Sequence, residues 1–325
     1  MSTNQITNQI DLIGTIPPES SGERCDVALA KLFPQYSRSQ LQAWVHNGYV
    51  TLDRKAITQV RLKVAHDQVV EIHAPLPRTQ HFEAQPIALN IVFEDNSLLI
   101  INKPVGLVVH PGAGQPDQTL LNALLHHDPH LSTLPRAGII HRLDKNTSGL
   151  LVIARSLSAH HALIKQMKAH HIEREYFAVA KGILIAGGTI EANIGRSTVH
   201  RTRMAIIDSG RPAITHYRVV ERFRAHTYLR VQLETGRTHQ IRVHFTHIHH
   251  PLVGDPLYGQ HIGIPAKLSE PLKTYLRNFR RQALHAATLR LHHPVTHNLM
   301  EWHAPLPEDF AELLKLLRED VHVTQ

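Results

Sequence analysis

Residues 138–154 read GIIHRLDKNTSGLLVIA, which places one aspartate in a polar turn between two apolar runs. The runs 138–141 and 150–154 have the length and the branched residues of buried strands. A turn held between strands supports a side chain rigidly, and functional groups are often found there. Asp144 is therefore a candidate functional carboxylate. On this stretch alone, the simpler interpretation is favoured, a turn aspartate that hydrogen-bonds its own backbone.

The segments around this stretch alternate between strand-like and helix-like patterns. Strands are predicted at residues 87–93, 98–102, 176–180, 216–223, 228–233, 282–291 and 299–303. Helices are predicted at residues 119–126, 158–169, 237–247 and 308–317. Several connections are short enough for hairpins, so the predicted fold class is α+β, with a mixed, largely antiparallel sheet and flanking helices.

The N-terminal quarter of the chain predicts a separate small domain. Residues 1–20 are polar and are expected to form a flexible tail. Residues 21–75 contain two helical patterns, 26–33 and a second one capped by Ser37, followed by strand-like runs at 49–52 and 69–72. The prolines that follow predict a linker over 76–86, and the remaining 87–325 form the larger domain.

Composition limits the classes of protein that this chain can be. Its formal charge of +8 favours a polyanionic partner, although a basic protein without such a partner fits equally well. The single cysteine excludes an intramolecular disulfide, and neither a leader pattern nor a membrane-length apolar run is present. We expect a soluble, cytoplasmic protein without a membrane partner. The densest histidine cluster, at 247–250, leaves a metal site open but lacks cysteine partners.

Three further residues stand out by their position. Arg237 follows Gly236 where the helical pattern of 237–247 begins, and an arginine there calls for an anionic partner because the first turn carries the positive end of the helix dipole. Lys103 starts a loop directly after an apolar strand. Tyr176 stands at the start of another strand, where a lone tyrosine is more often a packing residue.

The sequence resembles the RluA-type branch of the pseudouridine synthases. The similarity rests on residues 138–154 together with NKPVGLVVHPGAG from Asn102, EREYFAVAKG from Glu173, LETGRTHQIRVH from Leu233, HPLVGDPLYG from His250, RQALHAATLRLHHP from Arg281 and MEWHAPLP from Met300. It covers nearly the whole chain after residue 20. The resemblance implies the pseudouridine synthase fold for residues 87–325 and the conversion of uridine to pseudouridine in RNA.

The N-terminal unit resembles an S4 RNA-binding domain through GERCDVALAKL from Gly22 and SRSQLQAWVHNGYV from Ser37. Where the family has Asn-Gly and Gly-Asp turns, this chain has Leu52-Asp53-Arg54 and His66-Asp67, which weakens the turn assignments. The resemblance leaves a helix face with Arg38 and Gln42 as candidates for phosphate contacts.

The resemblance also assigns roles in the larger domain. Asp144 would be the sole catalytic carboxylate, acting as a nucleophile or as a base, and Arg237 would pair with it. Tyr176 would stack on the uracil and Ile241 would form an apolar wall of the base pocket. Arg142 would fill the space that a flipped uridine leaves, and Lys103 would contact RNA.

No cofactor or metal is implied, because the reaction includes neither a redox step nor a net hydrolysis. The expected partner is 23S rRNA of the large-subunit precursor, with the uridines of helix 69 as the target. The chain is expected to be a monomer without an obligatory protein partner. Two alternatives stay open, a sister enzyme of the same family acting on other 23S rRNA uridines and a non-catalytic RNA-binding assembly factor.

Overall fold

The computed structural model describes residues 9–75, 82–112, 114–200, 203–259 and 263–322. The chain divides into two compact units between His81 and Phe82, inside the linker that the sequence predicts. The later part of that predicted linker is instead bound to the second unit. The Gln85 backbone N–H donates to the Asn122 carbonyl at 3.0 Å, and the Asn122 amide donates to the Glu83 carbonyl at 2.8 Å.

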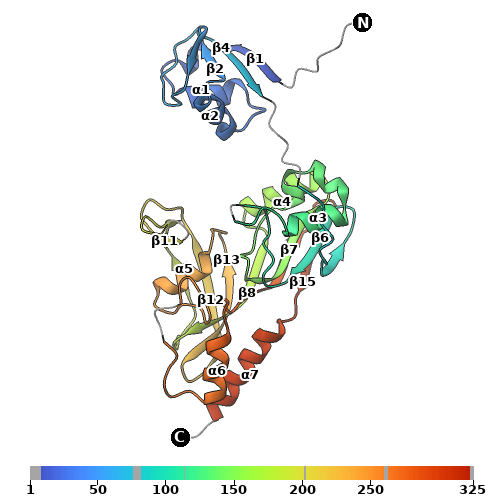
Figure 1. The fold of residues 1–325 in the computed structure, drawn as a ribbon, viewed down its shortest axis with the longest axis vertical. Helices are drawn as coiled ribbons and strands as arrows, with labels where there is room; N and C mark the ends of the chain where they lie inside the picture. Colours follow the sequence, from blue (N-terminus) through green and yellow to red (C-terminus); the bar gives the residue numbers. More distant parts are fainter. Residues whose placement is uncertain (1–8, 76–81, 113, 201–202, 260–262, 323–325) are drawn as a thin grey trace. The chain divides into compact units, whose positions relative to one another are not determined.

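The first unit is a four-stranded antiparallel sheet packed on two helices (Figure 1). Its elements are β1 (Gln9–Thr15), η1 (Pro18–Ser20), α1 (Cys25–Leu32), α2 (Arg38–His46), β2 (Val50–Leu52), β3 (Lys55–Ile57) and β4 (Val69–Pro75). The strand order is β1-β4-β2-β3. Ser37 caps α2 as predicted, since its hydroxyl accepts from the Gln40 N–H, and Leu41, Trp44 and Val45 are buried beneath the helix.

The prediction of a flexible tail over residues 1–20 is wrong for residues 9–20. Strand β1 pairs with β4 along its whole length, from Gln9 opposite Pro75 to Thr15 opposite Val69. Ile10 and Leu12 alternate with polar residues and pack on the core of the unit, which supplies the apolar contact that anchors the strand. Residues 1–8 lie outside the described residues.

The second unit is built on one large mixed sheet with strand order β5-β6-β7-β14-β8-β13-β12-β9, and β15 pairs with β14. Its strands are β5 (Ile91–Glu94), β6 (Leu98–Lys103), β7 (Ser148–Ala154), β8 (Glu173–Lys181), β9 (Gly188–Glu191), β12 (Ile214–Arg222), β13 (His226–Leu233), β14 (Leu284–His292) and β15 (Leu299–His303). Only the pairing of β7 with β14 is parallel among the pairs of this sheet in the described chain. The predicted mixed, largely antiparallel sheet is confirmed.

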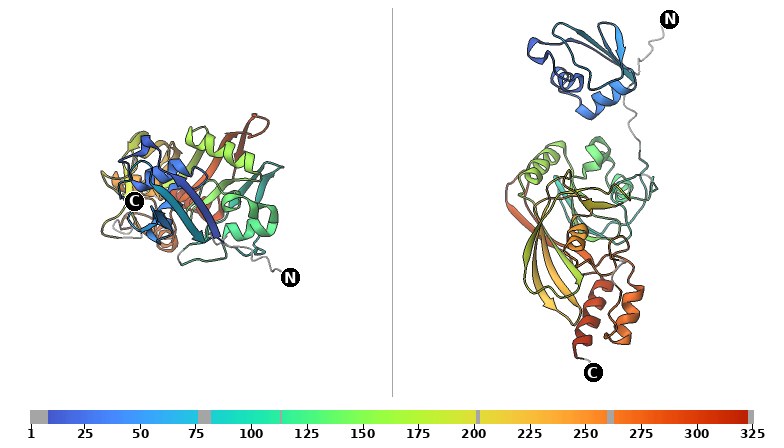
Figure 2. Two further views of the ribbon diagram at one scale, coloured as in Figure 1. Left: turned by 90° about the horizontal axis from the view of Figure 1, so that it is seen from above. Right: turned by 90° about the vertical axis from the view of Figure 1, so that its left-hand side faces the viewer.

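Helices cover both faces of this sheet (Figures 1 and 2). They are α3 (Leu120–His127), α4 (Leu157–Lys168), α5 (Gln240–His247), α6 (Glu270–Asn278) and α7 (Glu308–His322), with short 3-10 turns η2 (Pro129–Thr133) and η3 (Pro135–Gly138). Alternate residues of β6 and β7 face α3 on one side and α4 on the other. Two small strands, β10 (Ile194–Arg196) and β11 (Met204–Ile206), form a separate hairpin.

The strand predicted at 138–141 is wrong. The chain makes the 3-10 turn η3 and then a single bridge from Ile139 to Ile153. Helix α4 begins at Leu157, one residue before the predicted start, and is capped by Ser156, whose hydroxyl accepts from the Ala159 N–H. Elements β9, β10, β11 and α6 were not predicted.

Gly149 fixes the point at which β7 leaves the polar turn. Its φ is +114°, and a Cβ placed on it would lie 2.1 Å from the carbonyl oxygen of Ala286 on β14. A side chain would therefore break the contact between the two parallel strands, which pair at His285 opposite Ser148 and Ala286 opposite Gly149. This close approach seats the Asp144 turn against the end of the sheet.

Candidate active site

A cleft of about 920 Å³ opens at the end of β7 and β8 in the second unit. The turn that follows η3 supplies residues 139–144 to its lining, β8 supplies Arg174 and Tyr176, and the segment 233–242 supplies a further part of the lining. Asp144, Tyr176, Arg142, Arg237 and Ile241 all line it, so the structure brings together most of the residues expected from the sequence.

The turn that carries Asp144 is held by contacts from several segments. The Thr147 N–H donates to the Asp144 carbonyl at 3.0 Å, and the Thr147 hydroxyl accepts from the Gln282 amide at 2.9 Å. The Lys145 carbonyl accepts from the Gly106 N–H at 2.9 Å and from the Lys103 ammonium at 3.0 Å. These bonds fix the backbone on both sides of the carboxylate, which is the rigid support that a reacting group needs.

The partner of Asp144 is Arg242, which lies in the first turn of α5. The Arg242 Nη1 donates to Asp144 Oδ2 at 2.8 Å, while Nε and Nη2 donate to the two oxygens of Asp255 at 2.8 and 2.9 Å. The Arg242 side chain is 4% exposed and that of Asp255 is fully buried. Burial disfavours the charge on Arg242, but the hydrogen bonds and charges of Asp255 and Asp144 outweigh it and raise its pKa.

Asp255 is itself fixed, which makes Arg242 a rigid donor. Its Oδ1 also accepts from the N–H groups of Leu257 and Tyr258, at 2.9 and 3.1 Å. The guanidinium carbon of Arg242 lies 5.1 Å from the centre of the Tyr258 ring, a cation–π contact. Asp144 Oδ1 accepts no hydrogen bond from the described residues, so one oxygen of the carboxylate is held and the other faces the cleft.

The expected pairing of Arg237 with Asp144 is wrong. Helix α5 begins at Gln240, with His239 in a left-handed conformation at its N-cap, so Arg237 lies before the helix. The Arg237 Nε donates to the Pro212 carbonyl at 3.1 Å. The argument from the helix dipole therefore fails for Arg237, because it is not in the first turn. Arg242 lay in the same quoted motif but was not selected.

His239 and Tyr258 form a second contact network beside Asp144. The His239 Nδ1 lies 2.9 Å from the Tyr258 hydroxyl, and its Nε2 is 3.9 Å from Asp144 Oδ1. Burial lowers the pKa of His239, an effect that the charge of Asp144 opposes. Sequence reasoning missed His239, Tyr258 and Asp255, although the quoted motifs from Leu233 and His250 contain all three.

Tyr176 belongs to β8, is 5% exposed and lines the cleft. Burial raises the pKa of its hydroxyl; the positive charge of Arg174 opposes that rise and the negative charge of Asp144 adds to it. Ile241 is 4% exposed and lines the same cleft. Arg142 is exposed at the cleft, two residues before Asp144.

The expected RNA contact of Lys103 is contradicted by its position. Its side chain is buried, and its ammonium donates to the carbonyls of Pro104, Leu107 and Lys145 at 2.7, 3.0 and 3.0 Å. Three acceptors use all three N–H groups of an ammonium, so none is left for a phosphate. Burial lowers the pKa of Lys103 to about 7, a fall that Asp144 opposes and Arg281 adds to. Lys103 anchors the Asp144 turn instead.

Arg38 and Gln42 lie on one face of α2 in the first unit, where both bind the buried carboxylate of Asp26. Arg38 Nη2 and the Gln42 amide each donate to Asp26 Oδ2 at 2.6 Å. Burial alone would raise the pKa of Asp26, but the bonds from Arg38, Gln42 and Arg24 lower it to about 2. Half of the Arg38 side chain stays exposed, so its outer face can still meet an anion.

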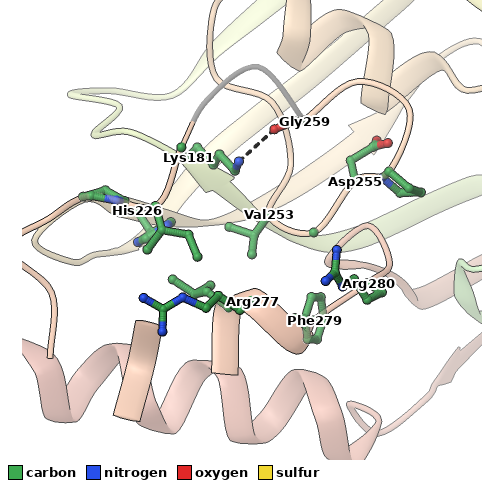
Figure 3. Close-up of a pocket in the computed structure, with 14 residues that line it drawn as sticks. Lys181, His226, Val253, Asp255, Gly259, Arg277, Phe279 and Arg280 are labelled. Atoms are coloured by element: carbon green, nitrogen blue, oxygen red, sulfur yellow. Dashed lines mark hydrogen bonds between the residues drawn. The ribbon is translucent and has the colours of Figure 1, made fainter. Parts of the chain in front are cut away.

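A second cavity, of about 200 Å³, is lined in part by residues 253–256, the segment that carries Asp255 (Figure 3). It is lined by Lys181, His226, Val253, Arg277 and Phe279 among others, and the Lys181 ammonium donates to the Gly259 carbonyl at 2.8 Å. Asp144, Tyr176 and Arg242 belong to the larger cleft.

Within the described ranges, no cluster of three or more histidine, cysteine or acidic residues is arranged to hold a metal ion. No helix in that part of the chain has the length and apolar character needed to cross a membrane.

The larger cleft combines one carboxylate with a fixed cation, a buried tyrosine and an apolar wall. A lone carboxylate with one free oxygen can attack an electrophilic carbon or remove a proton. Two other carboxylates of this region are bound to cationic or polar partners: Glu234, which lines the cleft, lies 2.6 Å from His216 Nε2, and Asp255 accepts from Arg242. Neither forms with Asp144 the pair of free carboxylates that a glycosidase uses. The arrangement suits chemistry on a planar base whose sugar reaches Asp144.

Comparison with known proteins places this geometry in a family context. A family model described as RNA pseudouridylate synthase matches residues 97–247. The chain is 51% identical over 315 residues to "Ribosomal large subunit pseudouridine synthase D" of Yersinia pestis, with 97% of each chain covered. It is 49% identical over 315 residues to the protein of the same name from Escherichia coli (strain K12), again with 97% of each covered.

Two solved human structures are also similar. "Human RNA Pseudouridylate Synthase Domain Containing 4" aligns with a TM-score of 0.55 and 25% identity, covering 70% of this chain and 93% of that one. "Human RNA Pseudouridylate Synthase Domain Containing 1" aligns with a TM-score of 0.52 and 25% identity, covering 73% and 98%.

Proposed function

The chain belongs to the RNA pseudouridylate synthase family, and we propose that it isomerises uridine to pseudouridine in 23S rRNA, with the uridines of helix 69 as its target. The family and the enzyme class agree with the sequence motifs, and a non-catalytic assembly factor is not carried further. The names of the relatives support a large-subunit rRNA substrate. The choice of helix 69 rests on the sequence resemblance alone.

The observation that carries the mechanism is the Asp144–Arg242 pair in the cleft. Pseudouridine formation breaks the N1–C1′ bond, turns the uracil and joins C5 to C1′. Asp144 is the group proposed to act at the sugar, either on C1′ as a nucleophile or on a sugar proton as a base. Arg242, itself fixed by Asp255, holds one oxygen of Asp144 so that the other meets the nucleotide.

Tyr176 and Ile241 are proposed to hold the base. Both are buried and line the cleft, one from β8 and the other from α5, and in this proposal the uracil lies between the aromatic ring and the aliphatic side chain. A stacked uridine cannot reach this depth, and the nucleotide must leave the RNA helix first. Arg142, exposed at the cleft, is the side chain proposed to replace it.

The S4-like unit is proposed as a second RNA contact. Arg38 and Gln42 are bound to Asp26, and Arg38 keeps an exposed edge. In this proposal, Asp26 orients the guanidinium and the exposed edge meets a phosphate. Residues 21–75 then add affinity for the RNA while the chemistry stays in the second unit.

The test is modification of unmodified 23S rRNA by the purified protein, with every pseudouridine mapped. We expect new pseudouridines in helix 69 and none with an Asp144→Asn variant. Pseudouridine at other sites, with helix 69 unmodified, would replace the proposed target by that of a sister enzyme. A wild-type protein that modifies no uridine in free rRNA or in large-subunit precursors would refute the proposed substrate.

A further inference from the structure

Arg174 is a buried cation in the cleft that pairs with no group of the described residues. It lies on β8 two residues before Tyr176, so both side chains point to the same face of the sheet. Arg174 is 7% exposed and lines the cleft. Among the described residues, its guanidinium takes part in no hydrogen bond or ion pair, and its Nε is shielded from solvent.

The other buried arginines of this unit are paired. Arg242 donates to Asp255 and Asp144, and Arg281 makes a two-pronged contact with Asp309 at 2.5 and 2.7 Å. Burying a guanidinium without an acceptor costs free energy, so a fold that retains one usually supplies the acceptor from elsewhere. The open face of Arg174 is the cleft, where a substrate provides that acceptor.

His141 adds a second unused donor beside Arg174. Its Nε2 accepts from the Val152 N–H at 3.1 Å, so in the neutral ring the hydrogen is on Nδ1. That Nδ1 is shielded and has no partner among the described residues. Because this Nδ1 is shielded, the donor open to a substrate oxygen in the cleft is the Arg174 guanidinium, through nitrogens other than its shielded Nε.

The depth of Arg174 selects the base over the RNA backbone as the source of that oxygen. The exposed cations at the cleft, Arg136, Arg142 and Lys168, are placed to meet phosphates, which stay in contact with solvent. Arg174 is buried beside Tyr176 instead. Gly236 lies directly over it, because a Cβ there would come 2.8 Å from Arg174 Nη1.

We propose that Arg174 donates to a carbonyl oxygen of the target uracil and stabilises the negative charge that the uracil gains when it leaves the sugar. This inference rests on the proposed role of Tyr176 as the base platform. When the N1–C1′ bond breaks, its electron pair leaves with N1 and the charge spreads onto the carbonyl oxygens. The electron deficiency at C1′ is met by the Asp144 carboxylate or by loss of a sugar proton. When C5 bonds to C1′, the Asp144 carboxylate is released or the sugar proton is returned, and the uracil becomes neutral. The C5 proton is then lost to a base and N1 takes up a proton, which leaves neutral pseudouridine.

The test compares Arg174→Met and Arg174→Lys with a matched control, Arg230→Met. Arg230 lies opposite Phe177 on β13, so it faces the other side of the sheet, and it is exposed. Single-turnover pseudouridine formation and RNA affinity at several salt concentrations are measured on 23S rRNA. We expect Arg174→Met to lower the rate constant about 100-fold, as loss of one charge-stabilising donor does. Its Kd should stay within about twofold and its salt dependence should not change.

A substrate with one altered oxygen separates direct contact from a structural role. RNA carrying 2-thiouridine or 4-thiouridine at the target replaces one carbonyl oxygen by sulfur, a weaker acceptor. Wild type and Arg174→Lys should be slowed by sulfur at the contacted position, and Arg174→Met should show little further loss, because the two changes remove one interaction.

Other outcomes would overturn the proposal. A weaker Kd with a salt slope shallower by about 0.7 would assign Arg174 to a phosphate. An unchanged rate for Arg174→Met would show that Arg174 does not contact the base. The same conclusion would follow if the rate loss from Arg174→Met and the rate loss from sulfur were additive for both thio substrates. If Arg174→Met does not fold, Arg174→Gln, which loses the charge but keeps a polar side chain, takes its place in the comparison, and it should lose less than wild type when sulfur replaces the contacted oxygen. If wild type leaves helix 69 unmodified, the same measurements apply to whichever uridine it modifies, so failure of the proposed target is seen separately.

Discussion

Replacing Asp255 by asparagine tests how Arg242 is held. The substitution keeps the shape of the side chain but removes its charge, and it turns an N–H group toward one of the donors of Arg242. Asp255 is fully buried and accepts four hydrogen bonds, two from Arg242 and two from the backbone of residues 257 and 258. Removing one partner of a buried ion pair costs about 3–5 kcal/mol, because the other charge stays buried.

Asp144 remains beside Arg242 and offsets part of that cost, so we expect Asp255→Asn to lose about 3 kcal/mol of stability. For a domain of this size, that corresponds to a fall in Tm of roughly 6–12 °C. The single-turnover rate should fall on the order of 100-fold, because a loosened Arg242 no longer fixes Asp144.

The assays are thermal unfolding and single-turnover modification of 23S rRNA, with Asp309→Asn as the matched control. Asp309 binds Arg281 by the same two-pronged contact but is 42% exposed and lies outside the cleft lining. The control should lose less stability and keep its rate. An Asp255→Asn protein with a Tm within about 2 °C of wild type and an unchanged rate would refute the reasoning.

Three other predictions concern the anchoring residues. Arg242→Lys should lose most of the single-turnover rate because one ammonium cannot serve two carboxylates, whereas Arg237→Lys should keep it; the reverse order would restore Arg237 as the partner of Asp144. Lys103 has a pKa of about 7 in the folded protein and near 10.4 when unfolded, so its contribution to stability improves as pH rises from 7 toward 10. Urea unfolding should therefore show wild type gaining about 2 kcal/mol relative to Lys103→Met between pH 7 and pH 9, and an unchanged difference would contradict a buried Lys103. Asp26→Ala should lower the Tm of the first unit and weaken RNA binding without changing the single-turnover rate at saturating protein; a slower rate at saturation would contradict the division of labour between the units.

The strands beside the site could be predicted because each of them is a continuous run of mostly apolar residues. All seven residues of β7 are buried, so its apolar run is unbroken, and β6 is nearly as apolar. Strand β1 could not be predicted in the same way. Its apolar residues alternate within a polar segment, and the strand exists because β4, about sixty residues away, pairs with it.

The error at Arg237 has a tertiary cause. The Gln240 side chain accepts from the Arg237 N–H and the Thr235 hydroxyl, and its amide donates to the Ile214 carbonyl and the Thr215 hydroxyl. These bonds hold residues 237–239 outside the helix, although the sequence after Gly236 looks helical. The start of a helix depends here on a neighbouring strand that local patterns do not contain.

Lys103 and Arg174 were misjudged or missed for related reasons. A lysine in a loop is nearly always exposed, and only the folded chain brings three carbonyls to one ammonium. Arg174 carried a usable signal, since it is two residues from Tyr176 on a strand and must share its face. The sequence does not reveal that this charge has no partner among the described residues, because that depends on which side chains the fold places around it.

Asp144 is the group on which the proposed chemistry depends most directly. The decisive measurement of this role is single-turnover pseudouridine formation on 23S rRNA by the Asp144→Asn variant, together with the Kd of the same variant for that RNA. We predict no detectable pseudouridine and a Kd close to that of wild type, because the substitution keeps the shape of the turn and changes one charge in the cleft. Pseudouridine formed at the wild-type rate would contradict the central claim and remove Asp144 from the chemistry.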